Sequence, residues 1–87
     1  METRTIKTKA ELKRLRVGTR LILIDCLMGP CHQPRTIKEV RSNSIKMQLE
    51  DGRISTLDLH GKLEPTAEGF LIRCEDGRIR VQYIVHA

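Results

Sequence analysis

The chain contains almost no aromatic side chains, with one Phe, one Tyr and no Trp among 87 residues. Its core must therefore be aliphatic, and few rings are available for stacking on the bases of single-stranded nucleic acid. Long apolar runs are also missing, since the longest is the four residues Leu21–Ile24. A membrane-spanning helix needs about 20 such residues. We therefore expect a cytoplasmic protein with neither a membrane segment nor a signal peptide.

Cysteine is sparse, and the odd number of three argues against a disulfide framework. We expect reduced thiols, with Cys26 and Cys74 as small buried hydrophobic side chains. Cys31 and His32, close to Cys26 in the chain, form the only cluster with metal-binding character. Structural zinc needs four converging ligands, commonly from two closely spaced pairs, and no second pair follows. We therefore predict no metal and no cofactor.

Patterns that carry catalysis are missing as well. The chain has no glycine-rich phosphate loop, no closely spaced histidine pair and no pair of carboxylates on one strand. Cys31 beside His32 is a poor nucleophile and base pair, because neighbouring side chains in an extended loop point apart. We expect a single domain, residues 1–87, without enzymatic activity. The alternative, a metal-dependent or thiol enzyme, requires a bound metal or a Cys31 far more reactive than a free thiol.

A capping box marks one short helix near the N-terminus. The Thr8 hydroxyl can accept from the backbone of Glu11, and the Glu11 side chain can reach back. Gly18 supplies a stop signal, so we expect a helix from Lys9 to about Arg16. The rest of the chain has the short alternating pattern of strands. Strands are predicted at 17–27, 36–41, 44–50, 53–59, 70–75 and 78–86.

Glycine, proline and asparagine predict the links between these strands. Two prolines and a glycine predict a loop at 29–34, because proline cannot donate to a β-ladder. Ser42 and Asn43 predict a turn, with Asn43 at positive φ. The segment 60–68 is expected to be an irregular connection.

The pentapeptide Glu-Asp-Gly-Arg-Ile occurs twice, beginning at Glu50 and at Glu75. Asp-Gly between alternating apolar residues is a strong signal for a β-hairpin. The inward side chains favour a three-residue loop with left-handed Gly52 at the first site, which pairs Ile45 with Leu57 and Met47 with Ser55. At the second site they favour a two-residue loop. That loop pairs Cys74 with Ile79, Ile72 with Val81 and Phe70 with Tyr83.

Six short strands and one helix predict a mainly-β fold. We expect a six-stranded antiparallel sheet, bent into a small barrel of the SH3-like or Sm-like kind, with one short N-terminal helix. An α+β sheet with the helix packed on one face is the alternative.

The net charge of +5 is concentrated at one end of the chain. Residues 1–20 hold seven bases and two acids, whereas residues 21–87 hold nine of each. A basic end on a neutral body suggests an anionic partner, most commonly nucleic acid. On the last hairpin, Arg73 and Arg80 are expected to lie opposite each other on the outer face. The candidate binding residues are Lys9, Lys13, Arg14, Arg16, Arg73, Arg78 and Arg80.

One family resemblance is carried by five short stretches of the second half of the chain. They are Arg35–Ile37, Val40–Asn43, Asp51–Leu57, Gly69–Ile72 and the dipeptide Asp76-Gly77. Together these stretches resemble small uncharacterised proteins encoded by bacteriophages and mobile elements, over roughly residues 35–83. The resemblance implies no established activity. It does imply a phage-like origin, and phage proteins of this size are often inhibitors of host machinery, anti-CRISPR proteins among them.

Two functions therefore fit the sequence. The first is a non-catalytic module that docks on nucleic acid, or on a nucleic-acid-binding host protein, through its basic N-terminal segment. The second is a stoichiometric inhibitor of a host defence system that acts by protein–protein binding. A homodimer through an unpaired sheet edge is compatible with both.

Overall fold

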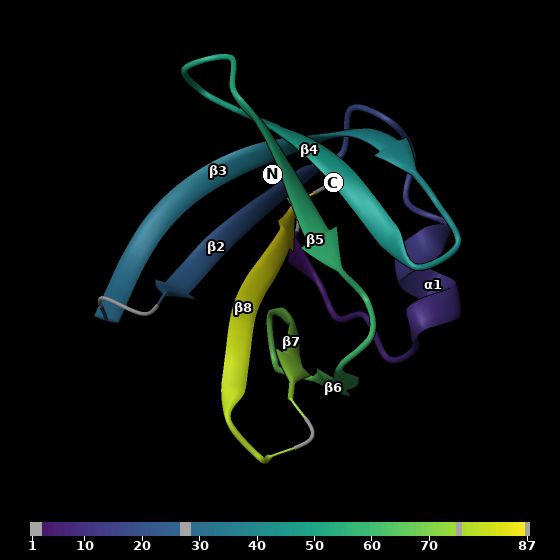
Figure 1. The fold of residues 1–87 in the computed structure, drawn as a ribbon, viewed down its shortest axis with the longest axis vertical. Helices are drawn as coiled ribbons and strands as arrows, with labels where there is room; N and C mark the ends of the chain where they lie inside the picture. Colours follow the sequence, from purple (N-terminus) through teal and green to yellow (C-terminus); the bar gives the residue numbers. More distant parts are fainter. Residues whose placement is uncertain (1–2, 27–28, 75, 87) are drawn as a thin grey trace.

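The computed structural model of the chain describes residues 3–26, 29–74 and 76–86, apart from the side chains of Thr3, Arg4, Cys26 and Arg80. They form a curled antiparallel sheet with one short helix beside it (Figure 1). The elements are β1 Thr3–Arg4, α1 Lys9–Lys13, β2 Arg20–Cys26, β3 Gly29–Val40, β4 Ser44–Leu49, β5 Ile54–Asp58, β6 Lys62–Pro65, β7 Gly69–Arg73 and β8 Ile79–His86.

Seven strands follow the order β5-β4-β3-β2-β8-β7-β6, and β1 pairs with the end of β8. Within the described chain, β5 and β6 each pair on one side only, so the sheet is a half-barrel with two open edges. The mainly-β prediction is confirmed, and all six expected strands are present. The structure adds β1 and β6. β6 was not predicted because Leu63 is the only large aliphatic residue within Lys62–Pro65, so this segment lacks the alternating pattern of a strand.

The inner face of the sheet and the helix enclose one aliphatic core. Phe70 and Tyr83 stack at its centre, with ring centroids 5.6 Å apart. Leu12 and Leu15 reach into the same core from the helical side and are buried. The N-terminal segment is therefore held to the sheet by hydrophobic packing.

The predicted helix cap is present, but the helix is shorter than expected. The Thr8 hydroxyl accepts a hydrogen bond of 3.1 Å from the backbone N–H of Glu11, and Lys9 begins the helix. The helix ends at Lys13 instead of Arg16. Thr19 then donates to the carbonyl of Arg16 across Gly18, whose φ is +98°.

The prediction of a loop at 29–34 is wrong, because these residues form the first half of β3. Ile37 exchanges backbone hydrogen bonds with Gly18 and Thr19, so its polar groups face the side of β2. By the two-residue period of a strand, the nitrogen of Pro34 faces away from β2. β4 has already ended on that side, since its last residue, Leu49, lies opposite Arg35. Proline is tolerated at such an edge position because no ladder donor is required there.

The expectation of a left-handed Asn43 is also wrong, since no non-glycine residue in the described segments has positive φ. The turn is closed by the N–H of Arg41, which donates to the carbonyl of Ser44 at 2.8 Å. The carbonyl of Asn43 accepts from Leu59, so this turn is tied to the end of β5.

The first hairpin has the predicted three-residue loop. Gly52 is left-handed at φ +92°, Ile45 lies opposite Leu57, and Met47 lies opposite Ser55. The N–H of Leu49 donates to the carbonyl of Arg53 at 2.8 Å and closes the loop.

The second hairpin is closed by the same backbone hydrogen bond as the first, so the prediction of a two-residue turn is wrong. The N–H of Cys74 donates to the carbonyl of Arg78, and Gly77 is left-handed at φ +85°. Ile79 is consequently paired with Arg73 instead of Cys74 and is exposed. The pairs Ile72 with Val81 and Phe70 with Tyr83 nevertheless form as predicted. A β-bulge, in which Arg80 is the extra residue, restores their register.

Candidate functional site

Four of the predicted binding residues lie together on the N-terminal segment. Lys13, Arg14 and Arg16 are exposed and Lys9 is half-buried. Lys9 and Lys13 are one helical turn apart and therefore share a face of α1. Among the described residues, none of these four bases has a carboxylate within 4.0 Å. We call residues 7–20 the basic segment.

The arginines of the sheet are arranged differently, because most of them have an acidic partner. Arg41, Arg53 and Arg78 each pair with the acid two positions earlier in the chain. Arg73 pairs with Glu64 of the neighbouring strand β6. Their positive charge is therefore offset locally.

The structure does not unite the predicted residues of the last hairpin with the basic segment. Figure 1 places α1 at one side of the molecule and the turn between β7 and β8 at its lower end. Arg73 lies opposite Ile79, so the expected facing pair of Arg73 and Arg80 is wrong. The side chain of Arg80 itself lies outside the described part of the chain. The basic segment is therefore the candidate site described below, and contact of Arg73, Arg78 and Arg80 with an anionic partner stays a prediction.

A second cationic position, Arg35, was missed as a site residue. Arg35 lies two residues before the buried Ile37, so it points to the inner face of the sheet. One terminal nitrogen, Nη1, donates to the Ser55 hydroxyl at 2.9 Å and to the Tyr83 hydroxyl at 3.4 Å. The other, Nη2, donates to Gln33 Oε1 at 3.2 Å. All three partners are neutral.

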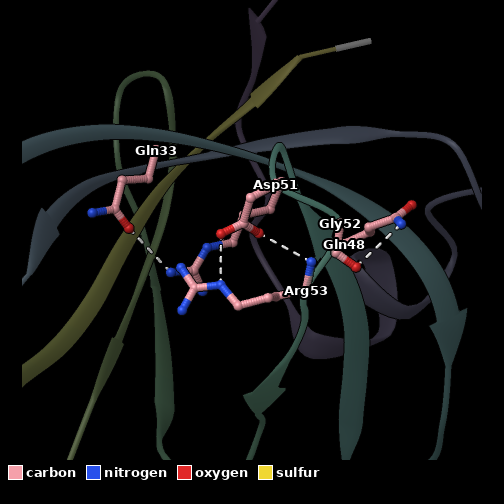
Figure 2. Close-up of polar contacts among 6 residues, drawn as sticks. Gln33, Gln48, Asp51, Gly52 and Arg53 are labelled. Atoms are coloured by element: carbon pink, nitrogen blue, oxygen red, sulfur yellow. Dashed lines mark hydrogen bonds and ion pairs between the residues drawn. The ribbon is translucent and has the colours of Figure 1, made fainter.

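The surroundings of Arg35 are polar and partly open. Leu49 lies opposite Arg35 in β4 and opposite Arg53 across the hairpin, so the two arginines share one row of the sheet. Figure 2 shows the Arg53 side chain folded back onto Asp51. Gln33, on β3, is drawn in the same view. A hollow of about 250 Å³ lies between β3 and this turn. It is lined by His32, Gln33, Pro34, Leu49, Glu50, Asp51 and Arg53.

Two pKa shifts report on these contacts. Burial raises the pKa of the Tyr83 phenol, while the charge of Arg35 and its hydrogen bond oppose part of that rise. The backbone N–H of Arg53 lowers the pKa of Asp51, and the Arg53 guanidinium lowers it further. Asp51 is thus held as the carboxylate beside Arg53.

A signal for Arg35 was present in the sequence. The predicted first hairpin already placed Ser55 on the inner face beside Met47, where a polar residue is unusual. Arg35 stands at an inward position of the neighbouring strand, because it precedes Ile37 by two residues. Two polar residues at inward positions of adjacent strands indicate a polar cluster. The assignment of 29–34 to a loop concealed the register that brings them together.

The positions of the described cysteine and histidine side chains do not support a reactive thiol or a metal site. Cys31 is half-buried, and its thiol donates to the carbonyl of Leu23 at 3.5 Å, while the His32 side chain is exposed. Cys74 is half-buried, and the side chain of Cys26 lies outside the description. Within the described segments, no three His, Cys, Asp or Glu residues gather closely enough to hold a metal ion. No helix found there has the length and apolar character needed to cross a membrane.

The chain was compared with family models, with curated proteins and with solved structures, and none of them matches it. The resemblance to phage and mobile-element proteins therefore stays a prediction.

Proposed function

We propose that this protein is a non-catalytic binding module that docks on nucleic acid through the basic segment. One observation carries the proposal. The bases of residues 9–16 are mostly exposed and have no acidic partner in the described chain, whereas four arginines of the sheet are paired with acids. Unpaired cations on a rigidly held segment can release counterions when they meet phosphates, and this release drives binding.

The aromatic residues support phosphate contact in preference to base stacking. Phe70 and Tyr83 are buried in the core, with exposed fractions of 0% and 1%. They cannot serve as a stacking platform without unfolding the sheet. Binding is therefore expected to be insensitive to sequence and strongly dependent on salt.

A salt titration tests the proposal. Binding of the full chain to fluorescently labelled single-stranded and duplex oligonucleotides is followed by anisotropy from low to physiological salt. The logarithm of the affinity should fall linearly with the logarithm of the salt concentration, with a slope of about −3 for four contacts to phosphates. Absence of binding at the lowest salt, or a slope near zero, would refute the docking function.

The inhibitor hypothesis is the second candidate, and the open sheet edge favours it. β5 ends the sheet at one side, and Ile54 on this strand is 57% exposed. An unpaired edge with an exposed aliphatic residue can receive a strand from another protein or from a second copy. Pull-down from nuclease-treated host lysate separates the two candidates. A discrete protein partner that survives the nuclease supports the inhibitor, and loss of all partners supports nucleic acid.

We also propose a fold family, an origin and a cellular location for this protein. A short antiparallel sheet curled around one aliphatic core is the arrangement used by SH3-like and Sm-like binding barrels, and we propose that this half-barrel is related to them in fold. A phage or mobile-element origin and a cytoplasmic location agree with a partner that handles nucleic acid. Determination of the gene's neighbours tests the origin directly.

A further inference from the structure

The strongest feature outside the basic segment is the guanidinium of Arg35. It is half-buried, yet within the described residues no carboxylate lies within 4.0 Å of it. Its Nε atom is buried and has no hydrogen-bond partner. A desolvated cation with only neutral partners is unfavourable, because burial removes water without supplying an opposite charge. Such a group is expected where an anion binds.

The hydrogen bonds show which side of the guanidinium is available. Nη1 is held from within the protein by Ser55 and Tyr83. The opposite edge carries the N–H of Nε, which is buried in this structure, and an N–H of Nη2. Once uncovered, such an edge binds an oxyanion through two parallel hydrogen bonds. On this side the only partner among the described residues is the Gln33 amide oxygen, which bonds to Nη2 alone.

Gln33 is placed to give way to a ligand. Its side chain is exposed and lines the hollow between β3 and the turn of the first hairpin. Rotation of this amide would exchange one neutral acceptor for a charged one and would give Nε its missing partner. Ser55 and Tyr83 would meanwhile keep the guanidinium in place.

We propose that the inner face of the sheet, beside the hollow between β3 and the turn of the first hairpin, binds a phosphate monoester group on the Nε side of Arg35. Gln33, the partner of Arg35, lines the hollow together with Arg53 and His32, so further hydrogen-bond donors lie near the proposed site. Several donors suit a tetrahedral group with three free oxygens better than a planar carboxylate. Glu50 and Asp51 also line it, and Asp51 engages Arg53, so binding of a single group is weak. The site does not involve the basic segment and does not depend on the proposed function.

The Nε–H signals of the arginines in ¹H–¹⁵N spectra of the intact protein test the site. Sodium phosphate is added at constant ionic strength, with sodium chloride as the reference. The Arg35 Nε–H signal should shift saturably with phosphate, whereas the chloride reference should leave it in place. R35K should abolish the saturable response of the surrounding residues, because lysine keeps the charge but lacks the two parallel donors. R41K, at an exposed arginine paired with Glu39, is the matched control and should respond like the wild type.

Two further variants and one further probe sharpen the result. Q33A should bind phosphate as well as the wild type or a few-fold more tightly, because the competing amide is gone. Should R35K fail to fold, the wild-type phenol absorbance still reports on the site, since Tyr83 is the only tyrosine. Bound phosphate offsets the Arg35 charge that opposes the rise in the phenol pKa, so the titration midpoint should move upward in phosphate and not in chloride.

The source of the phosphate is resolved by comparing ligands. A 5′-phosphorylated dinucleotide that binds more tightly than inorganic phosphate indicates a nucleic-acid end, and equal binding indicates a free ion. Acetate that binds as tightly as phosphate would overturn the phosphate assignment in favour of a protein carboxylate. An Arg35 Nε–H signal that moves equally in phosphate and chloride would overturn the site itself.

Discussion

The basic segment and the sheet carry similar side chains but use their charge differently. In the turns that join the strands, Arg41, Arg53 and Arg78 each bind the acid two positions earlier, so the chain neutralises them locally. In the basic segment, a single acid, Glu11, accompanies the six bases of residues 7–20. The difference shows that net charge alone does not locate a candidate binding surface. It is also necessary to know which basic side chains already have an acidic side chain beside them. Arg35 differs from these arginines, since its hydrogen-bond partners within the described chain are neutral. The strand lysines Lys38, Lys46 and Lys62 likewise have no carboxylate within 4.0 Å there.

The largest expected effect comes from removing the unpaired charge. Replacement of Lys9, Lys13, Arg14 and Arg16 by glutamine keeps helix propensity but deletes four phosphate contacts. Affinity for an oligonucleotide at low salt should fall by about 10³-fold, and the salt slope should approach zero. Anisotropy titrations measure both quantities.

The matched control for this variant deletes paired charge. Replacement of Arg41, Arg53 and Arg78 by glutamine removes three positive charges whose acids lie beside them. The affinity should change by less than about 10-fold. An equal loss in both variants would show that total charge, and not its pairing, determines binding.

The next largest effect concerns how the basic segment is attached. Leu12 is fully buried and joins the helix to the core of the sheet. Leu12→Ala should lower the free energy of unfolding by about 3 kcal/mol, because it leaves a cavity. Val17→Ala is the control in the same segment, since Val17 is 64% exposed, and should cost less than about 0.5 kcal/mol. Urea denaturation measures both, and similar values for the two variants would contradict the anchoring of the segment by its leucines.

A smaller effect is expected at the helix cap. Thr8→Ala removes the acceptor for the Glu11 N–H and should cost about 1 kcal/mol. Thr8→Ser keeps the hydroxyl and should be close to the wild type. Thermal unfolding followed by circular dichroism distinguishes them, and equal melting temperatures for Thr8→Ala and the wild type would argue against a stabilising cap.

The smallest effect tests a paired charge of the sheet. The pKa of Asp51 is lowered, first by the Arg53 N–H and then by its guanidinium, so the folded state holds the carboxylate to lower pH than the unfolded state. The Asp51 carboxylate therefore stabilises the folded state above the pKa of the unfolded state, about 3.9. This stabilisation is lost as the pH falls through the lower pKa of the folded state. The melting temperature of the wild type should exceed that of Asp51→Asn slightly at neutral pH, and the difference should vanish in acid. A constant difference across this range would exclude the ion pair as its cause.

The two Glu-Asp-Gly-Arg-Ile copies show how far sequence reasoning reaches. In both turns the aspartate accepts from the arginine N–H two positions on, at 3.0 Å, and the glycine is left-handed. The identical pentapeptides predict identical turns, but the pairing of the inward side chains favoured a shorter loop in the second hairpin. In the structure the turns are alike and the inward pairs also form, because Arg80 is accommodated as the extra residue of a β-bulge.

The sequence by itself determined the mainly-β class, the helix start at Thr8, the first hairpin and the charge imbalance, since each depends on residues near one another in the chain. Only the tertiary structure decided that Pro30 and Pro34 lie in a strand, that the second hairpin needs a bulge, and that Arg35 has no acidic partner among the described residues. These outcomes depend on which strands become neighbours. Contacts between distant segments decide where an unpaired edge or an unpaired charge is tolerated, and local patterns do not contain them.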